Sequence, residues 1–226
     1  MASSHITPRL YAFLNSLAKN NDRTWFEANR EQFECDVRTP LLSFISDFDV
    51  YLRRLSPHFV ADARKVGGSL FRIHRDVRFS KDKSPYKTNV GVHFRHELAQ
   101  DAHAPGYYLH LQPRNSFVGV GIWHPDTATA GRIRAAIQSE PEQWREAISD
   151  FGRFALDDEN KLRRRPPQVG EDHPCLDDIM RKDWIGVCSI GQSAACASDF
   201  MERFAAMCAS ATPFMRFLCR ALDMRF

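Results

Sequence analysis

The sequence lacks the features that mark secreted, membrane-spanning and disulfide-stabilised proteins. Its 226 residues contain no run of about 18 apolar residues, and residues 1–10 lack the basic start and apolar core of a signal peptide. None of the six cysteines forms a C-x-x-C pair, and four lie in apolar C-terminal segments where free thiols pack as small hydrophobes. We therefore expect a soluble cytoplasmic protein with reduced thiols and no membrane partner.

The common catalytic and cofactor motifs are also missing. There is no P-loop, no G-x-S-x-G and no nucleophilic Cys/His pattern. Gly119 and Gly121 do not form a dinucleotide-binding motif, because His124 stands where a third glycine is needed. In a strand, His93 and His96 point to opposite faces, so we predict no metal site, and we expect no cofactor. Glycine inside a strand instead indicates close approach of a ring or a ligand.

Neither sign of charge dominates the chain. The net charge is +3, with 26% charged and 43% hydrophobic residues, which is the composition of an ordinary globular protein. A domain of this length buries roughly 70% of its unfolded surface, enough for a real core. We expect a loose N-terminus over residues 1–7 and a single domain over residues 8–226.

Hydrophobic periodicity predicts an α+β fold. Its mainly antiparallel central sheet, of four or more strands, is flanked by N-terminal and C-terminal helices. We predict strands over residues 70–79, 87–94, 107–112, 117–123 and 184–190, with a hairpin turn at 113–116 and a polar loop at 97–105. We predict helices over residues 8–19, 22–37, 40–55, 127–148 with a break at Pro141, 176–181, and from 193 with a break at Pro213.

Residues 69–88, SLFRIHRDVRFSKDKSPYKT, concentrate the positive charge. They hold six Lys and Arg against two Asp, a local charge of +4, so the rest of the chain is close to neutral. Arg side chains bind phosphate as a planar fork and Lys side chains as a point charge, so several together are typical of an anion site. The candidate ligand-binding residues are Arg72, Arg75, Arg78, Lys81, Lys83 and Lys87.

Four residues are candidates for chemistry at such a site. Flanking positive charge keeps Asp76 and Asp82 ionised, which suits orientation of a cation better than general-acid catalysis. Tyr86 stacks on a ligand or closes the turn onto the core. His110 shares a strand face with Tyr108 and would be an acid, a base or a phosphate donor if its strand lies beside the basic one.

Several segments resemble a known family. They are FLNSLAKNNDRTWFEANR, RIHRDVRFSKDKSPYKT, GYYLHLQPRNSFVGVGIWHPD and RRRPPQVGEDHP. Together they are similar to the conserved bacterial and fungal family DUF2461, from about Leu10 to the C-terminus. The resemblance implies one globular α+β unit and carries no activity, substrate or catalytic residue with it. His74 departs from the family pattern, in which an aromatic residue such as Tyr is expected there.

Three functions are compatible with this sequence. The leading hypothesis is binding of a phosphorylated or otherwise anionic small ligand, with or without a reaction on it. The first alternative is nucleic-acid binding, in which the same cations contact phosphates while Trp25, Tyr86 or Trp123 stacks on a base. The second alternative is a structural or protein-interaction domain, in which the basic stretch forms a buried charge network joining helices to the sheet.

Overall fold

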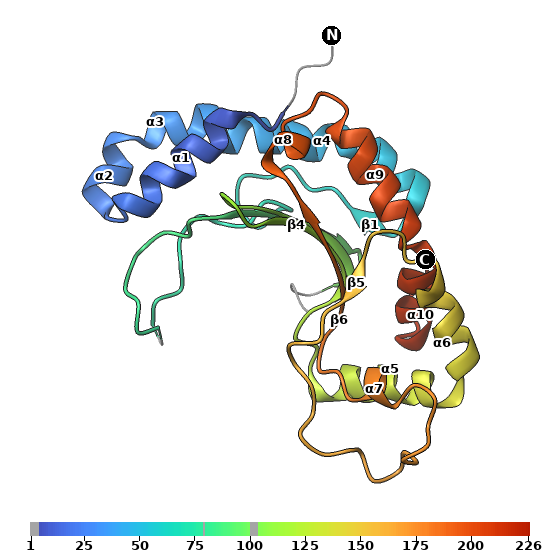
Figure 1. Ribbon diagram of the computed structural model, residues 1–226. Helices are drawn as coiled ribbons and strands as arrows, with labels where there is room; N and C mark the ends of the chain where they lie inside the picture. Colours follow the sequence, from blue (N-terminus) through green and yellow to red (C-terminus); the bar gives the residue numbers. More distant parts are fainter. Residues whose placement is uncertain (1–4, 79, 100–103) are drawn as a thin grey trace.

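The computed structural model describes residues 5–78, 80–99 and 104–226 of the chain. In the described residues, helices come first, four strands follow, and two further strands alternate with the later helices (Figure 1), which confirms the predicted α+β class. The N-terminal helical elements are α1 (Pro8–Lys19), α2 (Arg23–Ala28), α3 (Arg30–Phe33), the π-helical turn η1 (Glu34–Arg38) and α4 (Thr39–Leu55). The later helices are α5 (Thr127–Ser139), α6 (Pro141–Ser149), α7 (Leu176–Ile179), α8 (Gln192–Ala195), α9 (Phe200–Ser210) and α10 (Thr212–Ala221).

In the described part of the chain the sheet has six strands in the order β1-β2-β3-β4-β6-β5, and every neighbouring pair is antiparallel. The strands are β1 (Phe59–Val60), β2 (Val90–His96), β3 (Gly106–Leu111), β4 (Ser116–Ile122), β5 (Ala155–Leu156) and β6 (Trp184–Ile190). The predicted antiparallel sheet is confirmed. The predicted loop at 97–105 lies partly outside the described residues.

Local signals account for most element boundaries. The turn between β3 and β4 is closed by a hydrogen bond of 3.1 Å from Asn115 N–H to the Gln112 carbonyl, as the hairpin prediction requires. Pro141 ends α5 and opens α6, because proline is accepted in the first helical turn but not inside a helix. Pro213 likewise stands in the first turn of α10.

The predicted helix over residues 22–37 is divided into α2, α3 and η1. Asp22 caps α2, its carboxylate accepting the Trp25 N–H at 2.9 Å. Asn29 then interrupts the helix, because its side-chain amide bonds to the Trp25 carbonyl at 2.8 Å and competes with the regular backbone ladder.

The predicted strand over residues 70–79 is wrong. Residues 69–71 bond to the free edge of β2, and beyond them only isolated bridges form, such as His74 with Tyr86. Residues 72–78 and 80–88, which we call the basic arm, fold back on each other away from the sheet (Figure 1). Regular pairing with the sheet resumes only at Val90, not at residue 87. Residue 79 lies outside the described part of the chain.

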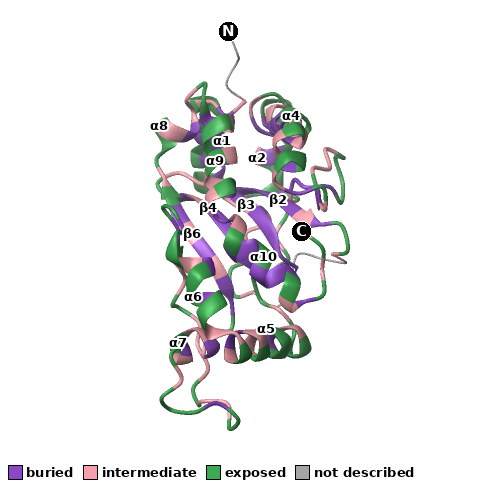
Figure 2. Cartoon of the chain, turned by 90° about the vertical axis from the view of Figure 1, so that its right-hand side faces the viewer, coloured by how far each residue is buried: buried purple, intermediate pink, exposed green. Residues whose placement is uncertain are grey.

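The N-terminal helices together with α9 and α10 cover the convex face of the arched sheet (Figures 1 and 2). The ring of Phe94 on β2 lies 4.8 Å from Phe48 of α4 and 6.1 Å from Phe204 of α9. The packed region extends toward the N-terminus further than we predicted, since Ile6 is 1% exposed and His5 bonds to Asp47 at 2.8 Å. The core therefore lies between the helices and one face of the sheet.

Candidate functional site

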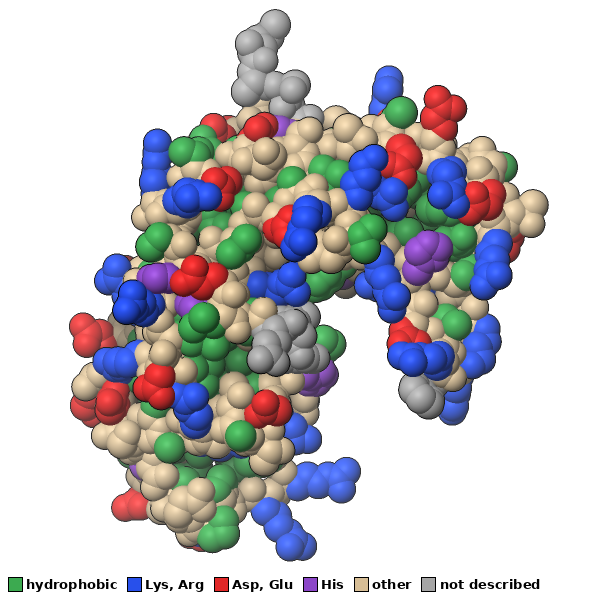
Figure 3. Space-filling model, turned by 180° about the vertical axis from the view of Figure 1, so that it is seen from behind, with side chains coloured by type: hydrophobic (Ala, Val, Ile, Leu, Met, Phe, Trp, Pro, Cys, Tyr) green, Lys and Arg blue, Asp and Glu red, His purple; other side chains and the backbone are tan. Residues whose placement is uncertain are grey.

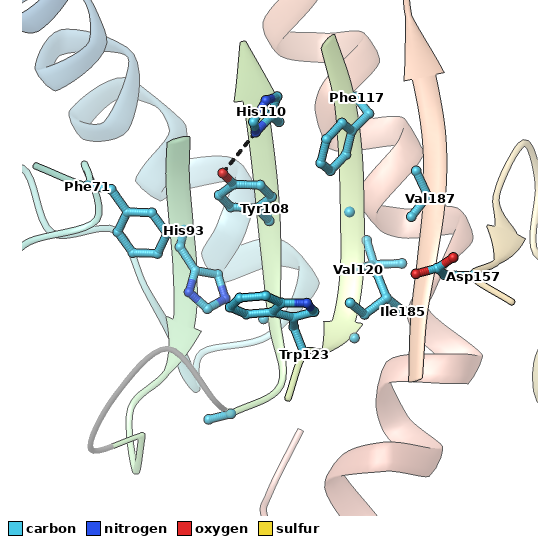
Figure 4. A pocket seen from close by; sticks show the side chains of 14 residues that line it. Phe71, His93, Tyr108, His110, Phe117, Val120, Trp123, Asp157, Ile185 and Val187 are labelled. Carbon is cyan, nitrogen blue, oxygen red and sulfur yellow. Dashed lines mark hydrogen bonds between the residues drawn. The ribbon is translucent and has the colours of Figure 1, made fainter. Parts of the chain in front are cut away.

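The concave face of the sheet holds a cavity of about 380 Å³. Alternation along β2, β3, β4 and β6 sends one set of side chains toward the helices and the other set toward this open face. Figure 1 shows the basic arm bordering the open face on one side and the α5 and α7 region on the other. The main side chains around the cavity (Figure 4) are Phe71, His93, Tyr108, His110, Phe117 and Trp123.

Glycines on the concave face make room for the rings of neighbouring strands. A Cβ atom on Gly91 would lie 2.4 Å from the Tyr108 hydroxyl, and one on Gly106 would lie 2.3 Å from Nε2 of His93. Any larger residue at these positions would displace the rings. The cavity therefore has an aromatic surface that lies close to the backbone of β2 and β3.

Tyr108 and His110, which line the cavity, belong to a short chain of hydrogen bonds. The Tyr108 hydroxyl lies 3.1 Å from Nδ1 of His110, and Nε2 of His110 lies 3.0 Å from Oε1 of Gln112. The His110 ring stacks on Phe117 with centroids 4.5 Å apart. Burial raises the pKa of Tyr108 to about 12 and lowers the pKa of His110, an effect that the Gln112 bond partly offsets. The predicted common face of Tyr108 and His110 is confirmed, and both groups are neutral near pH 7.

His93 lies at the edge of the same cavity, beside Trp123 (Figure 4). It is 7% exposed, and its ring lies 5.9 Å from Phe71 and 6.1 Å from Tyr108. Burial, and secondarily Arg95, lowers the pKa of His93 to about 4. Its imidazole is therefore uncharged near pH 7.

Most charges of the basic arm are paired with one another and exposed. Arg75 bonds to Asp82, and Arg78 bonds to Asp76 through two nitrogens, at 3.0 and 2.6 Å. Lys83 donates to the Val77 carbonyl at 2.9 Å. Arginine bonds lower the pKa of Asp76 to about 2, and the Ser84 hydroxyl together with Arg75 depresses the pKa of Asp82. Neither carboxylate lines the cavity.

Arg72 and Lys87 differ from the other cations of the arm. The Nζ atom of Lys87 lies 5.5 Å from the centroid of Phe71, a residue that lines the cavity. Burial lowers the pKa of Lys87, and the nearby charge of Arg72 lowers it further. Among the described residues no carboxylate forms an ion pair with either side chain. Lys87 is therefore a partly buried cation against a cavity-lining ring, with the charge of the exposed Arg72 acting on it and no acidic partner among the described residues.

The remaining predicted residues lie elsewhere on the arm. Tyr86 is 2% exposed and its ring stacks on Phe26 with centroids 4.1 Å apart, so it closes the arm onto the core. Lys81 is exposed. Figure 3 shows Lys and Arg side chains along the arm, which is separated from the rest of the molecule by a deep notch. Lys87 thus lies against a cavity-lining ring, whereas Arg75, Arg78 and Lys83 are bonded within the arm.

A carboxylate and a histidine form a second polar group near the cavity. Oδ1 of Asp183 accepts the His124 backbone N–H at 2.5 Å and lies 3.1 Å from its Nδ1. Oδ2 accepts the side-chain amide of Asn160 at 2.9 Å. The backbone of His124 has φ 47°, an uncommon value for a residue with a side chain. Its ring lies 4.1 Å from that of Trp123, which lines the cavity.

Sequence reasoning missed Phe71, His93 and Phe117 as residues of the cavity, and it missed the role of Asp183. The glycines within the strands were the available signal, since Gly91 and Gly106 lie directly under two of the rings. Pairing of His124 with Asp183 has no local sequence signature, because 59 residues separate them.

Comparison with known proteins gives a family and no function. The family model described as conserved hypothetical protein (DUF2461) matches residues 9–217. No curated protein matched the sequence. In the part of the chain that the structure describes, no helix combines the length and apolar character needed to cross a membrane, and no three His, Cys, Asp or Glu side chains gather as a metal site would require. The match covers most of the chain, and the protein belongs to the DUF2461 family.

Proposed function

We propose that the protein binds an anionic small molecule at the concave face of its sheet. The observation that carries this proposal is the position of Lys87, a partly buried cation without an acidic partner among the described residues, against Phe71, which lines the cavity. The exposed Arg72 adds a second positive charge near Lys87. A partly buried ammonium group beside a second cation is unfavourable unless an anion compensates it. A phosphate or carboxylate bound there would relieve this cost.

The cavity next to these cations suits an apolar or aromatic body. Tyr108 and Phe117 offer ring surfaces over a floor of glycine backbone, and the volume of about 380 Å³ lies in the range of small-molecule sites. We therefore expect the ligand to combine a negative group with a planar or apolar part. If the ligand undergoes a reaction, His110 would be the general acid or base. Its imidazole is neutral and is held in the cavity by Tyr108 and Gln112.

Thermal unfolding with a panel of anions tests the proposal. The panel contains inorganic phosphate, ribose 5-phosphate, citrate and the four nucleoside 5′-monophosphates. A ligand present at about 100 times its dissociation constant should stabilise the folded protein by about 2.7 kcal/mol. We expect a shift for the wild type, and no shift for Lys87→Met.

Lys65→Met is the matched control, because Lys65 is exposed on a turn away from the cavity and the charge change is the same. It should respond to the anion as the wild type does. Equal shifts for all three proteins would contradict a site at Lys87, and the absence of any shift in the wild type would refute anion binding.

Single-stranded nucleic acid is the second candidate ligand. Trp123 is 52% exposed at the border of the cavity, and the basic arm presents exposed cations across the notch (Figure 3). Stacking on exposed aromatics and contacts to phosphates are the means by which proteins bind single strands. Binding of an oligonucleotide that weakens steeply with salt, together with indifference to mononucleotides, would favour this candidate over the first.

A further inference from the structure

His93 is a buried polar group whose hydrogen bonds are not made. Its Nδ1 atom is enclosed and has no hydrogen-bond partner. Its backbone N–H bonds to the Ser69 carbonyl, but neither ring nitrogen has a partner among the described residues. The Tyr108 hydroxyl, which lies on the neighbouring strand, is already engaged with His110.

Such a residue lowers the stability of the free protein. Burial removes the imidazole from water, and without replacement bonds the desolvation is uncompensated. A phenylalanine would fill similar space between Phe71 and Tyr108 without this cost. Buried polar groups without partners are rare in folded proteins, and each calls for a reason.

The position of His93 supplies the reason. Its Nε2 lies over Gly106, which lines the cavity floor, and its ring lies 5.9 Å from Phe71. The same Phe71 ring lies 5.5 Å from Nζ of Lys87 on the arm. Because Nδ1 is enclosed, Nε2 is the ring nitrogen that can reach a ligand, and it can form one hydrogen bond to a polar atom at the edge of a nitrogen heterocycle.

We propose that the ligand is a nucleoside monophosphate and that His93 recognises its base. The base would lie against Tyr108 and Phe117 with its polar edge bonded to His93, and the phosphate would reach Lys87. This inference rests on the proposed function, because it assigns the anion to the same two cations. It adds the class of the ligand and the residue that determines specificity for its ring.

The test combines thermal unfolding with calorimetric titration of His93→Phe. The probes are AMP, GMP, CMP and UMP, with ribose 5-phosphate as the probe that lacks a base. We expect the wild type to bind at least one nucleotide tenfold or more tightly than ribose 5-phosphate. His93→Phe should unfold at the same or a higher temperature, lose at least tenfold in affinity for that nucleotide, and bind ribose 5-phosphate as the wild type does.

His96→Phe is the matched control on the same strand. His96 is also buried, at 2% exposed, but it faces the helices, where Nε2 bonds to the Arg225 carbonyl at 2.8 Å and Nδ1 accepts the Leu98 N–H at 3.2 Å. Because its bonds are made, His96→Phe should lower the unfolding temperature and leave nucleotide affinity unchanged. His93→Leu repeats the test with a smaller apolar side chain.

Each contrary outcome has a distinct meaning. If both His93 variants are destabilised as much as His96→Phe, or fail to fold, His93 is structural and the inference is overturned. If ribose 5-phosphate binds as tightly as every nucleotide, base recognition is overturned while anion binding stands. If neither the nucleotides nor ribose 5-phosphate bind, and other anions do not bind either, this inference and the proposed function both fail.

Discussion

At the residue scale, two histidines three positions apart on β2 have opposite surroundings. His96 points to the helices and both its ring nitrogens have partners, whereas His93 points to the cavity and neither does among the described residues. The difference follows from the alternation of a strand, which places positions 93 and 96 on opposite faces. The sequence predicted this separation but not which face is covered by helices.

The depressed pKa of His93 predicts a loss of stability in acid. In the unfolded chain the imidazole takes up a proton near pH 6.5, but in the folded protein it does so only near pH 4. As the pH falls between these values, His93 is protonated in the unfolded state but not in the folded state. The free energy of unfolding therefore decreases by about 3 kcal/mol.

Urea unfolding at pH 7 and pH 4.5 measures this effect. The free energy of unfolding should fall less between the two values in His93→Phe than in the wild type. Burial also lowers the pKa of His110, but that contribution is common to both proteins. An identical decrease in the free energy of unfolding of the two proteins would show that the pKa of His93 is not lowered by folding.

The exposed ion pairs of the basic arm should contribute little to stability. Arg78 and Asp76 are 77% and 44% exposed, and both belong to the arm, so they do not join helices to the sheet as a buried charge network would. We expect Asp76→Ala to unfold at the same temperature as the wild type by circular dichroism. A large drop would support the structural role of the arm that the exposure of this pair disfavours.

Substitution of Asp183 should reduce the stability of the protein far more than substitution of Asp76. Its carboxylate accepts bonds from His124 and Asn160, and an asparagine would present a donor where an acceptor is needed. We expect Asp183→Asn to reduce the free energy of unfolding by about 1–3 kcal/mol in urea titration. Asp172→Asn, at an exposed position, is the control that should leave it unchanged. Equal stability of the two variants would contradict a structural role for the carboxylate.

At the element scale, the glycines of the strands are essential to the cavity. A methyl group on Gly106 would meet Nε2 of His93 at 2.3 Å, whereas one on Gly131 of α5 would meet open space. We expect Gly106→Ala to destabilise the protein by about 1–3 kcal/mol and to weaken the thermal shifts caused by anions that carry a base. Gly131→Ala should stabilise it by about 0.5–1 kcal/mol, because alanine is the better helix former.

Thermal unfolding of both glycine variants, with and without the anion that shifts the wild type, checks this prediction. Gly131→Ala is expected to keep the anion response. If Gly106→Ala is as stable as the wild type, the rings are free to move aside and the shape of the cavity is not fixed by this glycine.

The elements themselves were predictable to different degrees. Apolar spacing identified α1 and α4, and the signals at Asp22 and Pro141 located the start of α2 and the break between α5 and α6. The alternating pattern over residues 70–79 was misleading, because alternation shows that a segment is extended but not whether another strand pairs with it. Residues 72–78 and 80–88 pair mostly with one another, not with the sheet.

Strand alternation predicted one part of the candidate site, and it could not predict the pairing of charges on the basic arm. Tyr108 and His110 share a face by simple alternation, and this was confirmed. The pairing of cations with carboxylates on the basic arm depends on how the arm folds back. Sequence periodicity does not predict how the arm folds back. Arg75 and Asp82 meet only because residues on the two sides of the arm lie opposite each other.

At the scale of the whole molecule, we propose that residues 8–226 unfold as one unit. Trp144 and Trp184, 40 positions apart, both bond to Asp178, and Arg134 of α5 bonds to the carbonyls of Ile179 and Arg181. Tryptophan fluorescence and far-ultraviolet circular dichroism should therefore give coincident urea transitions. Two separate transitions would divide the chain into independent units.

The edge strands β1 and β5 are only two residues long each, while the strands between them have six or seven. Long unpaired edge strands let sheets of different molecules pair edge to edge and are a common origin of aggregation. Edge strands of two residues offer few backbone groups with which a strand of another molecule could form hydrogen bonds. We therefore expect addition of a foreign strand at β1 and β5 to be disfavoured, although one broad face of the sheet is not covered by helices.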